Sequence, residues 1–154
     1  MALFLDEIDR KILNVLQRDG RRANTDLAKE VGLSPSPCLR RLHILEESGV
    51  VARYVALLNP AAIGMNLEIF VRVTLDRQDT ESVNAFTSHI LKAPKVLDCH
   101  MLAGDCDFLL RVVAADLTEY QDFVMNHLSQ IPGVRNVRTE VPLQTIKKTT
   151  EYPL

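Results

Sequence analysis

The second half of the chain contains a short acidic turn whose residues are suited to binding a small molecule. The turn, Gly104-Asp105-Cys106-Asp107, separates two apolar runs. Glycine permits close approach to the backbone, and free N–H groups in such a turn bind a carboxylate. Because Asp105 or Asp107 can hold an ammonium group, the turn offers both contacts that a free amino acid requires. The alternative interpretation is a solvated hairpin tip.

The first half of the chain carries a second candidate, a set of basic and hydroxyl side chains within residues 21–41. Leu39, Leu42 and Leu45 recur at helical spacing, so we expect them to face a core. The side chains between them are then free to meet base edges or phosphates, as arginine and serine do in DNA complexes. The predicted DNA contacts are Arg21, Arg22, Ser34, Ser36, Pro37, Arg40 and Arg41, with His43 and Arg53 as further candidates. The alternative is a three-helix bundle with solvated arginines that binds other proteins.

Three predicted helices position these basic side chains. Apolar residues at helical spacing predict helices over 5–18, 25–31 and 35–48. Asp6 can cap the first helix, Gly32 ends the second, and Ser34 followed by Pro35 is a typical start for the third. The joint between the last two helices has the length that a helix-turn-helix needs. Residues 50–58 alternate enough to predict a short hairpin or wing.

After residue 66 the apolar period changes from helical to alternating, which indicates strands. Strands are predicted over 67–76, 96–103, 107–115 and 134–144, and helices over 83–91 and 117–131. This βαββαβ order predicts an α+β fold class, with an N-terminal winged helix-turn-helix and a C-terminal ferredoxin-like domain. Strand 107–115 is apolar on both faces, but two helices cover only one face of a four-stranded sheet. We therefore expect the other face to pair with a second subunit, giving a homodimer.

Composition and charge are compatible with this organisation. The chain has 154 residues, 47% of them hydrophobic, and a net charge of −2. Residues 1–54 hold nine Lys/Arg against eight Asp/Glu, so DNA binding has to rest on a local basic patch. No run approaches the roughly 20 apolar residues of a membrane span, and residues 1–9 do not form a signal peptide. We expect a cytoplasmic protein with no membrane contact.

Motifs spread along the chain resemble the Lrp/AsnC, or feast/famine, family of bacterial transcription regulators. They lie at residues 8–13, 19–22, 31–42, 46–51, 57–60, 96–100, 104–110 and 131–134. The longest, from Val31 to Leu42, contains the predicted helix joint and the start of the third helix. The likeness covers almost the whole chain in the family's order, which makes it specific.

The resemblance implies a ligand class and an assembly that the residues alone do not predict. It implies that the C-terminal domain is of the RAM type and binds an amino acid, leucine- or methionine-like, where two dimers meet. Matching effector-binding positions are Leu102, Ala103, Gly104, Asp105, Asp107, Thr139 and Val141. It further implies dimers assembling to an octamer on promoter DNA, nucleoid-associated, with no cofactor besides the effector. The family often has an aromatic residue where this chain has Cys106, and that departure affects the shape of the pocket.

Two other function classes compete with this interpretation. Catalysis is disfavoured because Cys99 and His100 are adjacent on a strand and point to opposite faces, and no phosphate loop or nucleophile motif is present. The three cysteines fit no zinc or redox spacing, so we predict no metal site and no enzyme. A ligand-independent protein that coats DNA is the remaining alternative.

The predicted domains are a helix-turn-helix over 1–52, a linker or wing strand over 53–64, and an effector-binding and oligomerisation domain over 65–154.

Overall fold

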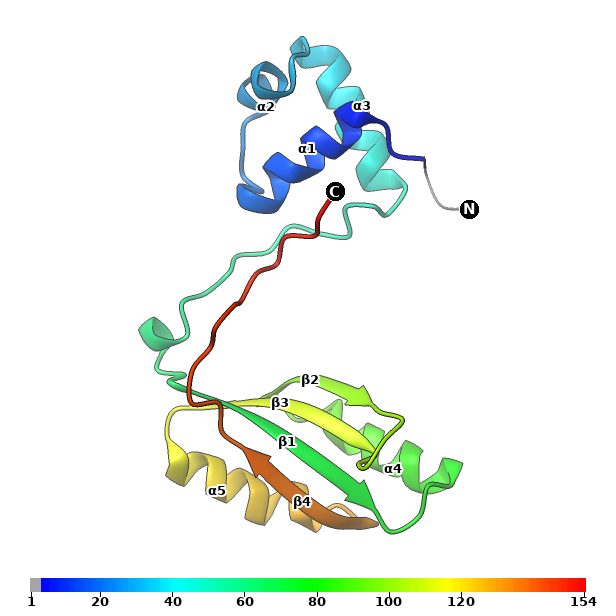
Figure 1. Cartoon of the computed structure of the whole chain (residues 1–154), viewed down its shortest axis with the longest axis vertical. Helices are drawn as coiled ribbons and strands as arrows, with labels where there is room; N and C mark the ends of the chain where they lie inside the picture. The colour runs from blue at the N-terminus through cyan, green and yellow to red at the C-terminus, as the bar shows by residue number, and fades with distance from the viewer. Residues whose placement is uncertain (1–3) are drawn as a thin grey trace. The chain divides into compact units, whose positions relative to one another are not determined.

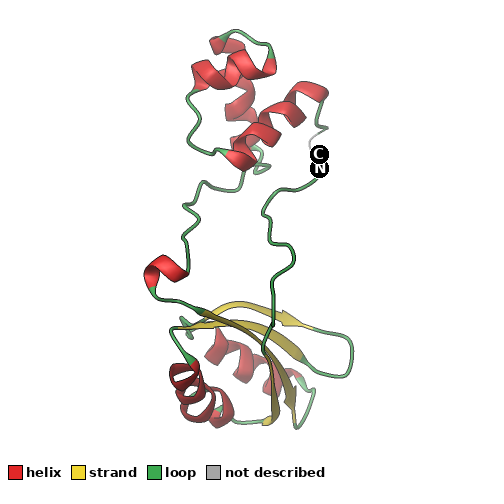
Figure 2. Ribbon diagram, turned by 60° about the vertical axis from the view of Figure 1, so that its left-hand side comes forward, coloured by secondary structure: helices red, strands yellow, loops and turns green. Residues whose placement is uncertain are grey.

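The computed structural model describes residues 4–154, which divide into two compact units (Figures 1 and 2). The N-terminal unit contains the chain up to Leu57 together with residues 147–154, and the C-terminal unit contains residues 58–146. The division differs in two places from the predicted domains, because the predicted linker 53–64 is divided between the units after Leu57. Residues 147–154, which the sequence assigned to the C-terminal domain, pack with the N-terminal unit.

The N-terminal unit is built from the predicted helices. They are α1 (Glu7–Arg18), α2 (Asn24–Val31) and α3 (Pro35–Glu47). Asp6 caps α1 as predicted: its carboxylate accepts from the N–H of Asp9 at 2.8 Å, and the Asp9 carboxylate accepts from the N–H of Asp6. Gly32 ends α2 with a φ of 76°, which favours glycine. Ser34 precedes α3 and Pro35 is its first residue, but the Ser34 hydroxyl makes no capping bond.

The core face of α3 differs from the prediction by one position. Cys38 and Leu45 are buried and Leu42 packs against the core, whereas Leu39 is 41% exposed. The spacing 38, 42, 45 follows the helical period more closely than the leucine-only spacing 39, 42, 45. Burial also raises the pKa of the Cys38 thiol, as expected for a cysteine that serves as a small apolar core residue.

The predicted wing is wrong for the described chain, since residues 50–58 form no strand. The segment runs extended, and all but Val51 of it is exposed. A hairpin needs a turn and a second strand, and this segment contains neither. Tyr54 instead anchors its start to the helices, because its hydroxyl donates to Glu46 at 2.9 Å and its ring lies against Gly20. Burial, followed by the bond to Glu46, raises the pKa of Tyr54 to about 12.

The C-terminal unit confirms the predicted ferredoxin-like order. Its elements are η1 (Ala61–Ile63), β1 (Leu67–Leu75), α4 (Thr80–Ile90), β2 (Val96–Met101), β3 (Phe108–Ala114), α5 (Leu117–Asn126), η2 (Leu128–Gln130) and β4 (Val134–Glu140). The strands form one sheet in the order β2-β3-β1-β4, with antiparallel neighbours throughout. Asp79 and Asp116 cap α4 and α5 through their carboxylates.

Both helices of this unit lie on one face of the sheet (Figure 1). Alternate residues of β1 and β3 are therefore buried, while the residues between them face the other side. The core beneath the helices contains Ile69, Val71, Val73, Phe86, Phe108, Leu110, Val112, Phe123 and Leu128. Within residues 58–146, no helix covers the opposite face of the sheet (Figure 2).

The C-terminal tail is part of the N-terminal unit through specific contacts with α1. The side-chain amide of Gln17 donates to the carbonyl of Tyr152 at 3.2 Å, and its oxygen accepts from the N–H of Tyr152 at 2.5 Å. Arg18 forms an ion pair with Glu151 at 3.1 Å. Tyr152 and Leu154 line a shared cavity with apolar residues of α1. The two-way bond to Gln17 resembles strand pairing, because the amide side chain acts as a peptide group.

We expect removal of residues 147–154 to destabilise the N-terminal unit by about 1–2 kcal/mol, since the two bonds to Gln17 and the apolar cover of α1 are lost. The exposed Arg18–Glu151 pair adds little. Urea unfolding followed by circular dichroism measures the change. Tyr152→Ala separates the two contributions, because it keeps both bonds of Gln17 to the backbone and removes only the ring that lines the cavity, so it should destabilise the unit less than removal of the tail. Equal stability of the shortened and full chains would contradict the docking of the tail.

Candidate functional site

The joint between α2 and α3 is held by a side chain that bridges the two helices. The amide of Asn24, the first residue of α2, donates to the carbonyl of Pro35 at 2.9 Å. This bond ties the start of α2 to the start of α3 and so sets how α3 leaves the joint. The N-terminal half of α3 then presents Ser36, Pro37 and Arg40 to solvent, all of them exposed. These positions match the part of a recognition helix that enters the major groove.

Arg41 does not belong to that exposed set, although the sequence placed it there. Its guanidinium lies 2.7 Å from Asp6 and 2.8 Å from Asp9, and its side chain is only 29% exposed. Hydrogen bonds to Asp9 and Asp6 raise the pKa of Arg41, while the N–H of Asp9 and then Arg41 lower the pKa of Asp6. Arg41 thus holds α3 to the capped start of α1, so its guanidinium is used within the unit and is not free to contact DNA.

The other predicted DNA contacts differ in how free they are. Arg21 and Arg40 are exposed and form no ion pair within residues 4–154. Arg22 pairs with Glu30 at 2.9 Å, so its charge is partly neutralised. Ser34 is exposed beside Pro35 at the joint. Among the seven main predicted DNA contacts, the least restrained cations are therefore Arg21 and Arg40, and the further candidate Arg53 is likewise exposed.

In the C-terminal unit, Asp107 holds the acidic turn to the end of β1. Its carboxylate accepts from the N–H of Leu75 at 2.7 Å and from the side-chain amide of Gln78 at 2.6 Å. Its N–H donates to the carbonyl of Val73, and its carbonyl accepts from the N–H of Leu102. Asp107 is 6% exposed. Both of its carboxylate oxygens are used within the unit, which leaves the binding of an ammonium group to Asp105.

Asp105 extends from the same turn and is highly exposed. It pairs with Arg72 at 3.0 Å, and Arg72 also pairs with Glu140 of β4 at 2.9 Å. Arg72 therefore links the turn to β1 and β4. A Cβ added to Gly104 would meet nothing within 4 Å, so the space beside the turn is open to a ligand or another chain. The sequence interpretation missed Arg72, although a charged residue between apolar strand residues signals a partner on that face.

The remaining predicted effector residues lie in two places. Leu102 and Ala103 flank Asp105 in the turn and are exposed. Thr139 pairs in register with Val71, on the helix side of the sheet, whereas Arg72 faces the other side. The Thr139 hydroxyl is 2.6 Å from that of Tyr120, whose pKa is raised by burial. Val141 follows the end of β4 and is half-exposed. One chain therefore does not enclose a ligand with all seven residues.

The face of the sheet turned away from the helices combines apolar side chains with paired charges. Leu109 and Val113 are half-buried on β3 and alternate there with Arg111. Arg111 contacts both Asp98 and Glu68, and its bond to Asp98 raises its pKa. Arg72 and Arg111 on this face thus carry carboxylate partners already, which limits the cost of burying them against a second surface, whereas Arg138, in register with Arg72, is exposed.

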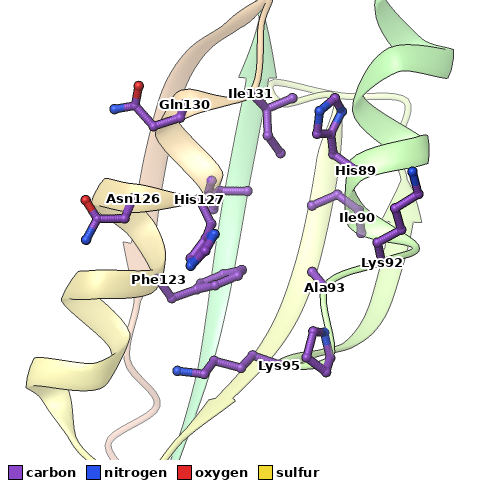
Figure 3. Close-up of a pocket in the computed structure, with 12 residues that line it drawn as sticks. His89, Ile90, Lys92, Ala93, Lys95, Phe123, Asn126, His127, Gln130 and Ile131 are labelled. Carbon is purple, nitrogen blue, oxygen red and sulfur yellow. The ribbon is translucent and has the colours of Figure 1, made fainter.

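A further cavity lies on the helix side of the same unit, between the ends of α4 and α5 (Figure 3). Its volume is about 560 Å³. Figure 3 shows Phe123 and His127 on the α5 side and Ile90 and Ala93 on the α4 side. No predicted DNA-binding or effector-binding residue lines this cavity. Its walls come from segments that are distant in sequence, so residue spacing carries no signal for it.

Family models match both units of the chain. The Lrp/AsnC ligand binding domain matches residues 68–152, and the AsnC-type helix-turn-helix domain matches residues 5–46. The leucine-responsive regulatory protein of Escherichia coli K12 is 41% identical over 145 residues, which cover 94% of this chain and 88% of that protein. The chain therefore belongs to the Lrp/AsnC family of transcription regulators.

Solved structures agree with that assignment. A transcriptional regulator from Neisseria meningitidis, in complex with L-methionine, has a TM-score of 0.93, 41% identity and 97% coverage of both chains. An AsnC family transcriptional regulator from Agrobacterium tumefaciens has a TM-score of 0.90, 39% identity and the same coverage. The chain is a ligand-responsive DNA-binding regulator and not an enzyme. Within residues 4–154, no helix is long and apolar enough to cross a membrane.

The contrast between Arg40 and Arg41 gives a direct test of the DNA surface. We expect Arg40→Ala to weaken operator binding about tenfold or more, with unchanged thermal unfolding, because a free arginine contact to DNA is lost. Arg41→Ala should lower the unfolding temperature, since Asp6 and Asp9 lose their partner. Gel shifts at two salt concentrations and calorimetric unfolding measure the two effects. An unfolding defect in Arg40→Ala, or none in Arg41→Ala, would reverse this assignment.

Proposed function

We propose that the chain is a sequence-specific transcription regulator whose assembly or DNA affinity responds to a leucine- or methionine-like amino acid. The observation that carries this proposal is the exposed carboxylate of Asp105 beside the open space at Gly104. An ammonium group pairs with Asp105, and backbone N–H groups of the turn bind the carboxylate. The methionine complex of the Neisseria meningitidis regulator supports an amino acid of this size and polarity.

The ligand site is completed by another copy of the chain. Leu102, Ala103 and Asp105 are exposed on the turn, whereas Thr139 lies on the opposite side of the sheet from Arg72. A ligand at the turn of one dimer therefore needs walls from a neighbouring dimer, and the family resemblance suggests an octamer built this way. Since ligand and assembly then share one interface, each influences the other by linkage.

Dimerisation through the uncovered face of the sheet is the first assembly step in this proposal. Leu109 and Val113 supply apolar area, while Arg72 and Arg111 have carboxylate partners within the chain. A two-fold axis through this face places two recognition helices on one duplex, which favours an imperfect palindrome as operator. Many copies acting together offset the low net charge of a single chain. We expect the protein to act on chromosomal DNA in the cytoplasm, associated with the nucleoid.

A thermal-shift screen across the twenty amino acids tests the sensing half of the proposal. A ligand that binds the folded state raises the unfolding temperature, so leucine or methionine should raise it and charged amino acids should not. If no amino acid shifts the unfolding temperature while operator binding persists, the chain is instead a ligand-independent DNA-architectural protein.

Asp105→Ala should weaken effector binding at least tenfold in calorimetry, because a charge-assisted hydrogen bond is removed. Asp105 is 81% exposed in its side chain, so the change should leave stability almost unaltered. Asp122→Ala is the control, as it removes an exposed carboxylate from α5. Unchanged affinity in Asp105→Ala would move the ligand site away from the turn.

Leu109→Lys should convert the dimer to a monomer at micromolar concentration, because it replaces an apolar side chain of the face by a cation directly beside Arg72. Sedimentation velocity measures the mass. Leu91→Lys introduces the same charge at a position that is 83% exposed on the helix side, and we expect it to remain dimeric. A dimeric Leu109→Lys chain would rule out this face as the interface.

A further inference from the structure

The cavity between α4 and α5 has the size of a small-molecule site. Its volume of about 560 Å³ lies within the roughly 300–1,000 Å³ that ligand pockets occupy. It forms because α4 ends at Ile90 and the chain turns through 91–95 into β2, while α5 ends at Asn126 and gives way to η2. The two helices therefore leave a gap over the sheet at this point, and the gap is lined by side chains from both (Figure 3).

The floor of the cavity is apolar. Ile90, Phe123, Leu128 and Ile131 are all buried and belong to the core of the unit. Ala93 adds a small side chain on the α4 side, which leaves room above the core. A ligand in this cavity would pack an aliphatic or aromatic group against these residues.

The rim of the cavity is cationic and contains no carboxylate. Of the twelve lining residues, two are lysines, two are histidines and none is Asp or Glu. Lys95 pairs with Glu119 at 2.8 Å, outside the lining set. Lys92 is exposed and forms no ion pair among residues 4–154. Lys92 is thus the unpaired cation of the rim, and because Figure 3 shows its ammonium on the outer side of α4, binding in the cavity requires another rotamer of Lys92. The Nδ1 atom of His89 already lies 2.8 Å from the carbonyl oxygen of Ala85, which leaves the other ring nitrogen of His89 and the ring of His127 at the rim.

We propose that this cavity binds an organic carboxylate with an apolar body and no ammonium group, such as a branched 2-oxo acid. Lys92 pairs with the carboxylate while the aliphatic body lies on Phe123 and Ile131. The turn at Asp105 differs in kind, because it supplies an anion for an ammonium group and this rim supplies none. The unit therefore carries two sites that distinguish an amino acid from its deaminated counterpart.

Two other occupants fit the cavity less well. A second copy of the chain, related by a two-fold axis at this face, would bring Lys92 and Lys95 close to the same lysines of its partner, which repel. Inorganic phosphate or a DNA phosphate would satisfy Lys92 but leave the apolar floor uncovered. The cation at the rim and the apolar floor of the cavity together favour a carboxylate that also has an apolar group.

Calorimetry on the full chain with 4-methyl-2-oxopentanoate tests the proposal. We expect saturable binding of one molecule per chain, with at least tenfold weaker binding of the neutral 4-methyl-2-pentanone and no comparable binding of inorganic phosphate. Lys92→Glu should weaken binding at least tenfold, equivalent to about 1.4 kcal/mol. Lys147→Glu, a charge reversal at an exposed lysine that does not line the cavity, should bind as the unaltered chain does.

Asp105→Ala separates this site from the proposed amino-acid site. The variant should keep its affinity for the oxo acid, whether or not it still binds leucine. Ala93→Phe, which fills the cavity without changing charge, should remove binding in a chain shown to be folded by thermal unfolding. The proposal is overturned if the oxo acid shows no saturable binding, if Lys92→Glu binds as tightly as the unaltered chain, or if Asp105→Ala loses binding.

Discussion

The sheet of the C-terminal unit has two faces, and the chain supplies helices for only one of them. This constraint organises the unit, because the buried residues of β1 and β3 alternate with others that α4 and α5 cannot reach. The uncovered face carries apolar residues together with Arg72 and Arg111, which already have carboxylate partners. Such a face is suited to a second sheet of the same kind, since these two charges are neutralised before they are buried. Proposed dimerisation and ligand binding both depend on this unequal covering.

Within the N-terminal unit, two neighbouring arginines on α3 have different roles. One turn of helix presents Arg40 to solvent and Arg41 to the capped start of α1. The carboxylates of Asp6 and Asp9 thus cap α1 and also hold α3, so the position of the recognition helix is set by the same groups that start the first helix. The DNA surface is accordingly positioned by charge-assisted bonds as well as by the apolar core.

The sequence predicted the element order, the helix joint and the family, because these depend on local periodicity and on motifs. It did not separate Arg40 from Arg41, or Cys38 from Leu39. Neighbouring residues of a helix point in different directions, so an error of one position in the predicted core face exchanges a buried side chain for an exposed one. It treated Asp105 and Asp107 alike, although the contact of Asp107 with Leu75 and Gln78 lies across about thirty positions of chain. The wing was predicted from alternation alone, which does not reveal the lack of a pairing strand. The cavity near Phe123 arises from helix ends that only the fold brings together.

The tail that docks on α1 has a consequence for how the two units are joined. The polypeptide passes from one unit to the other twice, once after Leu57 and once before Lys147. A single cut in the exposed segment after Leu57 would therefore leave the N-terminal unit held by the tail, through Gln17 and Arg18. A closed loop of this kind restricts the orientations that a DNA-binding unit can sample more than one linker does. Two segments of the chain therefore connect the DNA-binding unit to the ligand-binding unit of this regulator.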